Sequence, residues 1–248
     1  MKKLPVKGEA FKVNGRTAFI ITPKNTGPAG PMPWVWYAPT LPGLPDEIEK
    51  WMHQKFLDAG IAVAGIDVGE SYGSPEGVKH YAALYKELTT KRGFSKKPCL
   101  LARSRGGLML YNWAVENPKS VGGIAGIYPV CNIASYPGLR AACGAYGLNE
   151  RQLAAQLTKY NPIDRLAPLA KAGVPIFHIH GDKDDVVPLD KNSGEVARRY
   201  KKLGGKMTLQ IAEGQGHSGW QGFFRCKELI KFVITHAKEP PKAKAKKK

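Results

Sequence analysis

The stretch CLLARSRGG (residues 99–107) decides the fold, because an apolar run breaks there at a serine that is flanked by two arginines and followed by two glycines. Such a break does not suit the interior of a helix or of a strand. We interpret it as a strand, a sharp turn with Ser104 at its tip, and a helix. Small residues two positions before and after the serine, Ala102 and Gly106, relieve the crowding of such a turn.

Short apolar runs alternate with longer amphipathic ones on both sides of this turn. Regular alternation of continuous apolar strands with helices is typical of an α/β fold with a mostly parallel central sheet and helices on both faces. We predict a single domain over residues 1–237, with residues 131–160 as a small cap insertion. The predicted strands are 17–23, 33–39, 61–68, 98–102, 121–130, 174–181 and 206–214, and the predicted helices are 45–60, 78–93, 107–118, 192–205 and 222–237.

Two later loops carry partners for a reactive serine. In sheets of this kind the ligand chemistry gathers where the strands end. HIHGDKDDVVP (178–188) ends a strand with an acidic cluster, and EGQGHSGW (213–220) follows the next strand with His217. A nucleophilic serine needs a histidine to take its proton and an acid to orient that histidine. We therefore expect Ser104, His217 and an aspartate of the acidic cluster to form one site.

On these residues the chain resembles the α/β-hydrolases, near their prolyl-oligopeptidase-like and dienelactone-hydrolase-like branches, over about residues 15–237. The order serine, acid, histidine is the one that this fold uses. The family motif Gly-x-x-Asp-x-x-Val-Pro matches the chain from Gly181 to Pro188 and implies Asp184 as the acid, while GHSGW matches the family's histidine loop. The resemblance implies a serine hydrolase that needs neither a cofactor nor a metal ion.

The resemblance also implies an oxyanion hole. The family takes one donor from the loop after the third strand, often His-Gly-x-Pro-Gly, where this chain has PTLPG (39–43). Alignment on Pro-Gly makes the backbone N–H of Leu41 the donor and Thr40 the alternative, and Pro39 is excluded because it has no N–H. The second donor is expected to be the N–H of Arg105.

Four side chains are expected to bind substrate. Thr40 belongs to the oxyanion loop, and Tyr72 lies in the glycine-rich segment GESYGSPEG (69–77). Arg103 flanks the serine, where an arginine either favours an anionic substrate or is paired with an acid. Trp220 is either an anchor in the core or a platform for the substrate.

Other histidines allow a second interpretation. His178 and His180 share one strand face and three aspartates follow, which could build a metal site, but the other loops offer few further ligands. We expect His180 to lie behind the site or in the core. His53, which falls on a predicted helix, is expected on the surface.

The favoured function is hydrolysis of carboxylic esters, such as acyl or acetyl esters of carbohydrate-like or small aromatic substrates, through an acyl-enzyme. One alternative is a prolyl-oligopeptidase-like serine peptidase. The other is a non-catalytic module that binds polyanions. The formal net charge is +18, of which the terminal segment KEPPKAKAKKK (238–248) supplies +5. We expect this basic tail to be disordered and to associate weakly with polyanions.

Location, redox state and oligomeric state stay open from the sequence. No apolar run approaches the ~20 residues of a membrane span. The first fifteen residues lack the apolar segment of a signal peptide, which indicates a cytoplasmic protein if the chain is complete and an exported one if a leader was removed. The four cysteines contain no CxxC pair, and Cys131 and Cys143 are compatible with a disulfide or with two free thiols.

Overall fold

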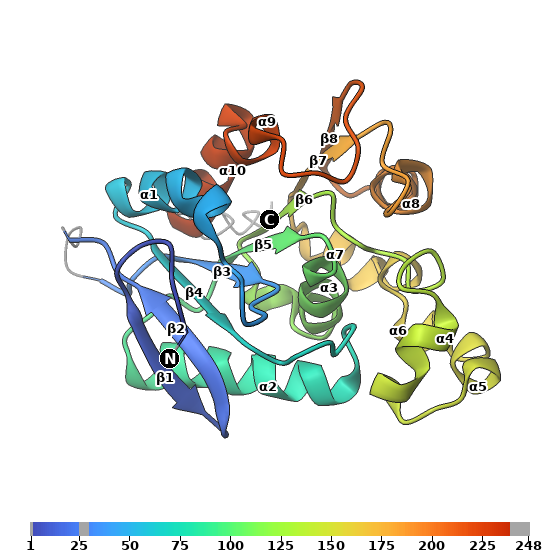
Figure 1. Ribbon diagram of the computed structural model, residues 1–248, viewed down its shortest axis with the longest axis horizontal. Helices are drawn as coiled ribbons and strands as arrows, with labels where there is room; N and C mark the ends of the chain where they lie inside the picture. The colour runs from blue at the N-terminus through green and yellow to red at the C-terminus, as the bar shows by residue number, and fades with distance from the viewer. Residues whose placement is uncertain (1, 25–29, 239–248) are drawn as a thin grey trace, which may run out of the picture.

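A central sheet runs through the protein (Figure 1). This computed structural model describes residues 2–24 and 30–238, and within them eight strands form one sheet in the order β1-β2-β4-β3-β5-β6-β7-β8. Neighbouring strands from β4 to β8 along this order pair in parallel, whereas β2 is antiparallel to both β1 and β4. The predicted mostly parallel sheet is confirmed. The strands are β1 (Glu9–Val13), β2 (Arg16–Ile21), β3 (Trp34–Ala38), β4 (Ala62–Ile66), β5 (Cys99–Arg103), β6 (Gly123–Ile127), β7 (Ile176–Gly181) and β8 (Met207–Ala212).

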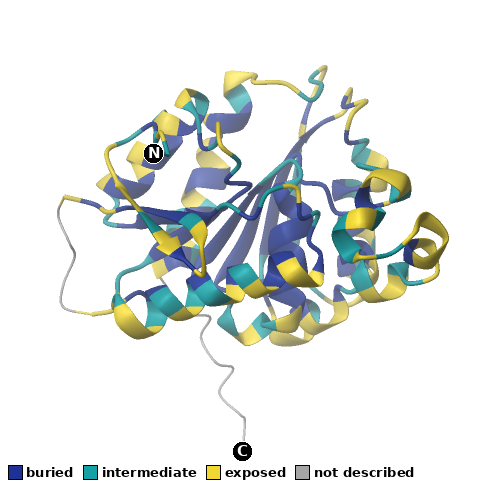
Figure 2. Cartoon of the chain, turned by 60° about the horizontal axis from the view of Figure 1, so that its bottom comes forward, coloured by how far each residue is buried: buried dark blue, intermediate teal, exposed yellow. Residues whose placement is uncertain are grey.

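Helices cover both faces of the sheet. Successive side chains of a strand point to opposite faces, and in β3 Trp34 and Trp36 pack into one core cluster while Val35 and Tyr37 pack into the other. The first cluster is completed by α2, α3, α7 and α8, and the second by α1, α9 and α10. Figure 2 shows the buried strands between helices whose outer faces are exposed. The helices are α1 (Lys50–Asp58), α2 (Pro75–Lys86), α3 (Gly106–Glu116), α4 (Leu139–Ala142), α5 (Glu150–Ala154), α6 (Leu157–Tyr160), α7 (Ala167–Ala172), α8 (Ser193–Lys202), α9 (Gln221–Phe224) and α10 (Lys227–Lys238).

Four local features differ from the sequence predictions. Strand β1 was not predicted, although the turn that joins it to β2 is Asn14-Gly15, both with positive φ, a strong hairpin signal. Helix α7 was also missed. The closing helix predicted over 222–237 is two helices, because Cys226 Sγ accepts the Leu229 N–H and caps the start of α10. His53 is fully buried rather than exposed, with its ring against Tyr37.

The inserted segment 131–160 contains α4, α5 and α6, which lie together beyond α3 (Figure 1). Its apolar side chains, among them Ile133 and Leu153, form a separate small cluster with Leu108 of α3. Tyr146 Oη donates to the Tyr72 carbonyl oxygen at 2.8 Å and ties the segment to the loop after β4. Its role as a cap over the site remains a prediction.

Further sequence predictions concern the cysteines, the tail and the membrane. Cys131 and Cys143, which the sequence allowed to be bridged, are free thiols in the structure. The predicted basic tail lies outside the described residues except for Lys238, which ends α10. Within the described ranges no helix is both long and apolar enough to cross a bilayer.

Candidate active site

Ser104 lies at a sharp turn between β5 and α3. Its φ of 47° is in the left-handed region, where a side chain other than glycine is strained. Three backbone hydrogen bonds hold it there: its N–H donates to the Ile127 carbonyl at 3.0 Å, and its carbonyl accepts from Gly107 at 2.9 Å and Val130 at 2.8 Å. The turn is therefore fixed from both sides, and the Ser104 side chain projects from a rigid support.

Two glycines allow helix α3 to begin immediately after the turn. A Cβ atom on Gly106 would lie 2.1 Å from the Ala38 carbonyl oxygen, and one on Gly107 would lie 2.2 Å from that of Val130. Both distances are far below van der Waals contact and both involve backbone atoms, which have little room to move. The glycines in the sequence RSRGG are thus required by the close approach of α3 to the ends of β3 and β6.

A continuous hydrogen-bonded chain joins Ser104, His217 and Asp184. Ser104 Oγ lies 2.9 Å from His217 Nε2, and His217 Nδ1 lies 2.8 Å from Asp184 Oδ2. The three residues come from loops that follow β5, β8 and β7, so the parallel sheet brings them together at one edge. The structure thus places the three residues of the predicted triad in the arrangement that nucleophilic catalysis by serine needs.

Asp184 is buried and saturated with donors. Its Oδ1 accepts the N–H groups of Val186 at 3.1 Å and Val187 at 2.7 Å, while Oδ2 faces His217 and, at 3.2 Å, Nε2 of His180. Burial acts to raise the pKa of Asp184, but the hydrogen bonds from the two histidines and a backbone N–H outweigh it and hold that pKa well below its usual range. Asp184 is therefore a carboxylate at neutral pH.

The ring of Tyr128 supports the imidazole of His217. The two ring centroids are 4.3 Å apart, and Tyr128 itself has a positive φ of 36°. Burial raises the pKa of the Tyr128 hydroxyl to about 12, although the nearby Arg103 opposes the shift. Tyr128 is thus a neutral side chain that restricts the position of the histidine ring.

A hollow of about 260 Å³ opens over the Ser104 hydroxyl. Both reacting groups, Ser104 and His217, border it, so a bound group can reach them from solvent. Arg103 and Arg105, two of the predicted site residues, border it as well. The other lining residues are Pro39, Leu44, Tyr128, Ser218 and Gly219.

A sequence profile of the prolyl oligopeptidase family matches residues 77–239, about two thirds of the chain. The chain belongs to the prolyl oligopeptidase family. No curated protein sequence matches it at a significant level.

Solved structures share the fold of this prolyl oligopeptidase family member. A puromycin-hydrolyzing peptidase of Mycobacterium tuberculosis superposes with a TM-score of 0.71 and 15% identity, over 96% of this chain and 42% of that chain. Est1E from Butyrivibrio proteoclasticus superposes with a TM-score of 0.68 and 16% identity, over 94% of this chain and 99% of Est1E. A truncated carbohydrate esterase from gut microbiota superposes with a TM-score of 0.66 and 17% identity, over 90% of this chain and 91% of that chain. The chain thus spans about two fifths of the peptidase and nearly all of each esterase.

The arginines beside the nucleophile of this family member are both paired with carboxylates. Arg103 donates to the buried Glu49 at 2.6 Å, and Glu49 also accepts from the Tyr37 hydroxyl. Arg105 pairs with Glu70. Each positive charge next to Ser104 is therefore paired with a carboxylate. Of the two alternatives that the sequence left open for Arg103, the structure shows pairing with an acid.

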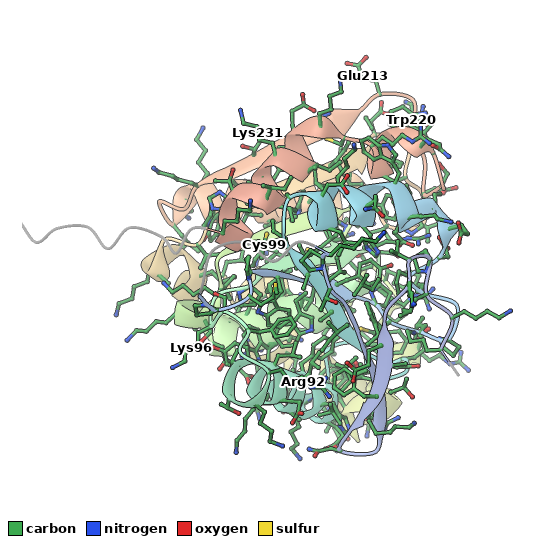
Figure 3. All side chains as sticks on the ribbon, turned by 90° about the vertical axis from the view of Figure 1, so that its left-hand side faces the viewer. Arg92, Lys96, Cys99, Glu213, Trp220 and Lys231 are labelled. Carbon is green, nitrogen blue, oxygen red and sulfur yellow. The ribbon has the colours of Figure 1, made fainter. Side chains whose placement is uncertain are left out.

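The remaining predicted binding residues lie outside the lining of the hollow. Thr40 is 2% exposed, and its methyl group packs where a side chain on Gly65 would be. Leu41 is half-buried, and its carbonyl accepts from Lys2 Nζ at 3.0 Å. Tyr72 lies in the loop after β4, with its carbonyl bonded to the inserted segment. Trp220, labelled near the periphery in Figure 3, is 44% exposed and packs edge-on against Phe223. Their roles in binding stay predictions.

Two residues that contact the site, Glu49 and Tyr128, were not predicted from the sequence. Glu49 is the third residue after Asp46, and the two form a capping box at the start of the 3₁₀ turn Glu47–Glu49, a pattern visible in the sequence. Tyr128 directly follows strand β6, where side chains of this fold reach the ligand edge. The pairing of Glu49 with Arg103 has no signal in the sequence, since 54 residues separate them.

Proposed function

We propose that this protein is a serine hydrolase that cleaves carboxylic esters through an acyl-enzyme. The observation that carries the proposal is the unbroken chain of hydrogen bonds from buried Asp184 through His217 to Ser104, whose hydroxyl borders an open hollow. A carboxylate, an imidazole and a hydroxyl in that order convert a weak nucleophile into a strong one.

In the acylation step, Ser104 Oγ attacks the carbonyl carbon of the ester while its proton passes to His217 Nε2. The resulting imidazolium is stabilised by Asp184, which also holds the proton on Nδ1 and leaves Nε2 free to accept. The carbonyl oxygen becomes an oxyanion. We assign its stabilisation to the N–H of Arg105, at the start of α3, and to the N–H of Leu41, each worth about 3–4 kcal/mol in comparable sites.

The leaving alcohol takes the proton from His217 Nε2 as the bond between the carbonyl carbon and the alcohol oxygen breaks. Water then attacks the Ser104 ester and gives its proton to the same nitrogen. Collapse of the second tetrahedral intermediate releases the acid and restores the Ser104 hydroxyl. No group beyond those of the site and the solvent is needed for the balance of atoms and protons.

Two considerations favour esters over peptides. The hollow is small and open, which suits an acyl group such as acetyl on a carbohydrate-like or small aromatic alcohol. The fold is also shared with Est1E and with the truncated carbohydrate esterase, so this fold occurs among proteins that act on esters. A peptidase is the second candidate, favoured by the likeness to the puromycin-hydrolyzing peptidase.

A fluorophosphonate probe tests the hydrolase proposal without knowledge of the substrate. We expect the probe to label Ser104 in the full chain and Ser104→Ala to abolish labelling while the circular dichroism spectrum is retained. Ser218, which borders the same hollow, provides the matched control, because Ser218→Ala should still be labelled. Absence of labelling in folded wild-type protein, or labelling at another serine, would contradict the proposal.

A substrate panel separates the two hydrolase candidates. p-Nitrophenyl esters of graded chain length, an acetylated polysaccharide and a proline-containing peptide p-nitroanilide would be compared by kcat/KM. We expect short acyl esters to be cleaved fastest and the peptide to be cleaved slowly or not at all. A higher kcat/KM for the peptide than for every ester would favour the peptidase.

A further inference from the structure

A second chain of polar side chains lies behind Asp184, on the side away from Ser104. Two histidines of β7, His178 and His180, both face the hydroxyl of Ser193 at the start of α8, at 2.9 and 2.8 Å from their Nδ1 atoms. At one end, His178 Nε2 lies 2.9 Å from the hydroxyl of Tyr111 on α3. At the other end, His180 Nε2 lies 2.8 Å from the Val187 carbonyl and 3.2 Å from Asp184 Oδ2. Tyr111, the two histidines and Ser193 are fully buried.

The acceptors at one end determine where the protons lie along this chain. The Val187 carbonyl and the Asp184 carboxylate can only accept, so His180 Nε2 carries a hydrogen and, in a neutral ring, Nδ1 accepts. Ser193 then donates to His180 and accepts from His178 Nδ1, which leaves His178 Nε2 to accept from the Tyr111 hydroxyl. Burial lowers the pKa of His178 to about 3, which agrees with a neutral ring. Each group in this series thus donates its hydrogen to the next group on the way from Tyr111 to Asp184.

We propose that His180, held by Ser193, is a positioning residue that fixes the Asp184 carboxylate for His217. This inference rests on the proposed serine hydrolase function and assigns a role to residues that the reaction itself does not use. Asp184 Oδ2 receives both histidines, His217 on the substrate side and His180 on the core side. The carboxylate is thereby prevented from turning, and part of its charge is engaged by His180.

The arrangement has a consequence for protonation of His217. Among the described residues, the titratable groups that interact with Asp184 or His180 are His217, Tyr128 and His178, and the last two are neutral at working pH. Arg103 and Arg105 border the hollow together with His217, and each is paired with a carboxylate. Loss of the His180 donor would leave more of the carboxylate charge to His217 and favour its protonated form. The acidic limb of the pH profile, where the reaction of Ser104 slows as pH falls, would then move to higher pH. A side chain that only fills space at position 180 would leave this limb in place.

The test measures the second-order rate of fluorophosphonate labelling at Ser104 as a function of pH in the full chain. His180→Leu removes the donor, and His180→Gln restores an N–H near the position of Nε2. His53→Leu is the matched control, because His53 is equally buried and its ring nitrogens have no hydrogen-bond partner among the described residues. Ser193→Ala is a second, milder perturbation that leaves His180 in place but removes the hydroxyl that holds it.

We expect His180→Leu to lower the labelling rate by about 100-fold, the effect of a displaced catalytic group, and to move the acidic limb to higher pH. His180→Gln should recover most of the rate, Ser193→Ala should show a smaller loss, and His53→Leu should match wild type at neutral pH. The inference is overturned if His180→Leu is labelled at the wild-type rate. It is also overturned if His180→Leu is labelled slowly but the acidic limb of its pH profile does not move and His180→Gln does not recover the rate. If wild type itself is not labelled at Ser104, the proposed function fails instead.

Discussion

Replacement of Asp184 by asparagine tests the proposed triad most sharply. All four groups around the carboxylate donate: the N–H groups of Val186 and Val187 face Oδ1, and His217 and His180 face Oδ2. An asparagine has one acceptor oxygen and one NH₂ group. If the oxygen keeps the two backbone bonds, the NH₂ group faces His217 Nδ1, which must then accept. The proton moves to His217 Nε2, and that atom can no longer take the proton of Ser104.

The structure therefore predicts that Asp184→Asn changes the tautomer of His217 and leaves the fold of the site intact. In a serine triad this exchange costs about 10⁴ in kcat, or about 5 kcal/mol of transition-state stabilisation. We expect Asp184→Asn to lower kcat by this factor with KM little changed, measured with p-nitrophenyl acetate together with active-site titration. A burst of p-nitrophenol in wild type and its absence in the variant would show that acylation is the step affected.

The neighbouring aspartates are matched controls for this experiment. Asp182 Oδ1 accepts the Gly214 N–H at 2.6 Å and ties the acid loop to the histidine loop, so Asp182→Asn should lower thermal stability and leave kcat near wild type. Asp185 is exposed, and Asp185→Asn should be close to neutral in both measurements. Retention of wild-type kcat by Asp184→Asn, or inactivity of Asp185→Asn with a normal melting temperature, would refute the reasoning.

Three further predictions concern positions outside the triad. Burial lowers the pKa of His53 to about 3, whereas an unfolded histidine has a pKa of ~6.5. Between these two values His53 is protonated only in the unfolded state. The free energy of unfolding therefore falls as pH falls through this window. His53→Leu should reduce that fall, measured by urea unfolding at about pH 7 and about pH 4.5, and an unchanged slope would contradict the assignment. Lys2 Nζ donates to the carbonyls of Thr40 and Leu41 at 3.0 Å each, and a trans peptide directs the Leu41 N–H to the opposite side. Lys2→Met should lower kcat about tenfold, part of the value of one oxyanion donor, and equal kcat would argue against Leu41 in that role. Deletion of residues 239–248 should leave turnover of a neutral ester within about twofold and lower the salt concentration at which the protein elutes from heparin resin. An unchanged elution would place the polyanion contact elsewhere.

The features that the sequence predicted correctly are those that depend on neighbours along the chain. Alternating apolar and amphipathic runs indicated the parallel sheet, since burial on both faces demands continuous apolar strands. The glycines around Ser104 indicated the sharp turn, because the strain of that turn and the crowding at its helix are local. The Asn14-Gly15 hairpin was equally local, and the failure to predict β1 came from its exposed, only partly apolar side chains.

Contacts between distant elements were decided by the tertiary structure alone. Nothing in the local pattern around Arg103 selects Glu49 as its partner, and nothing around His178 and His180 indicates that Ser193 lies between their rings. The same holds for His53, which the amphipathic pattern of its helix left on the surface but which packs against Tyr37. Side-chain periodicity determines which face of an element is buried, whereas the partner of a buried polar group is set by which elements the folded sheet brings within 3 Å, and that depends on the whole chain at once.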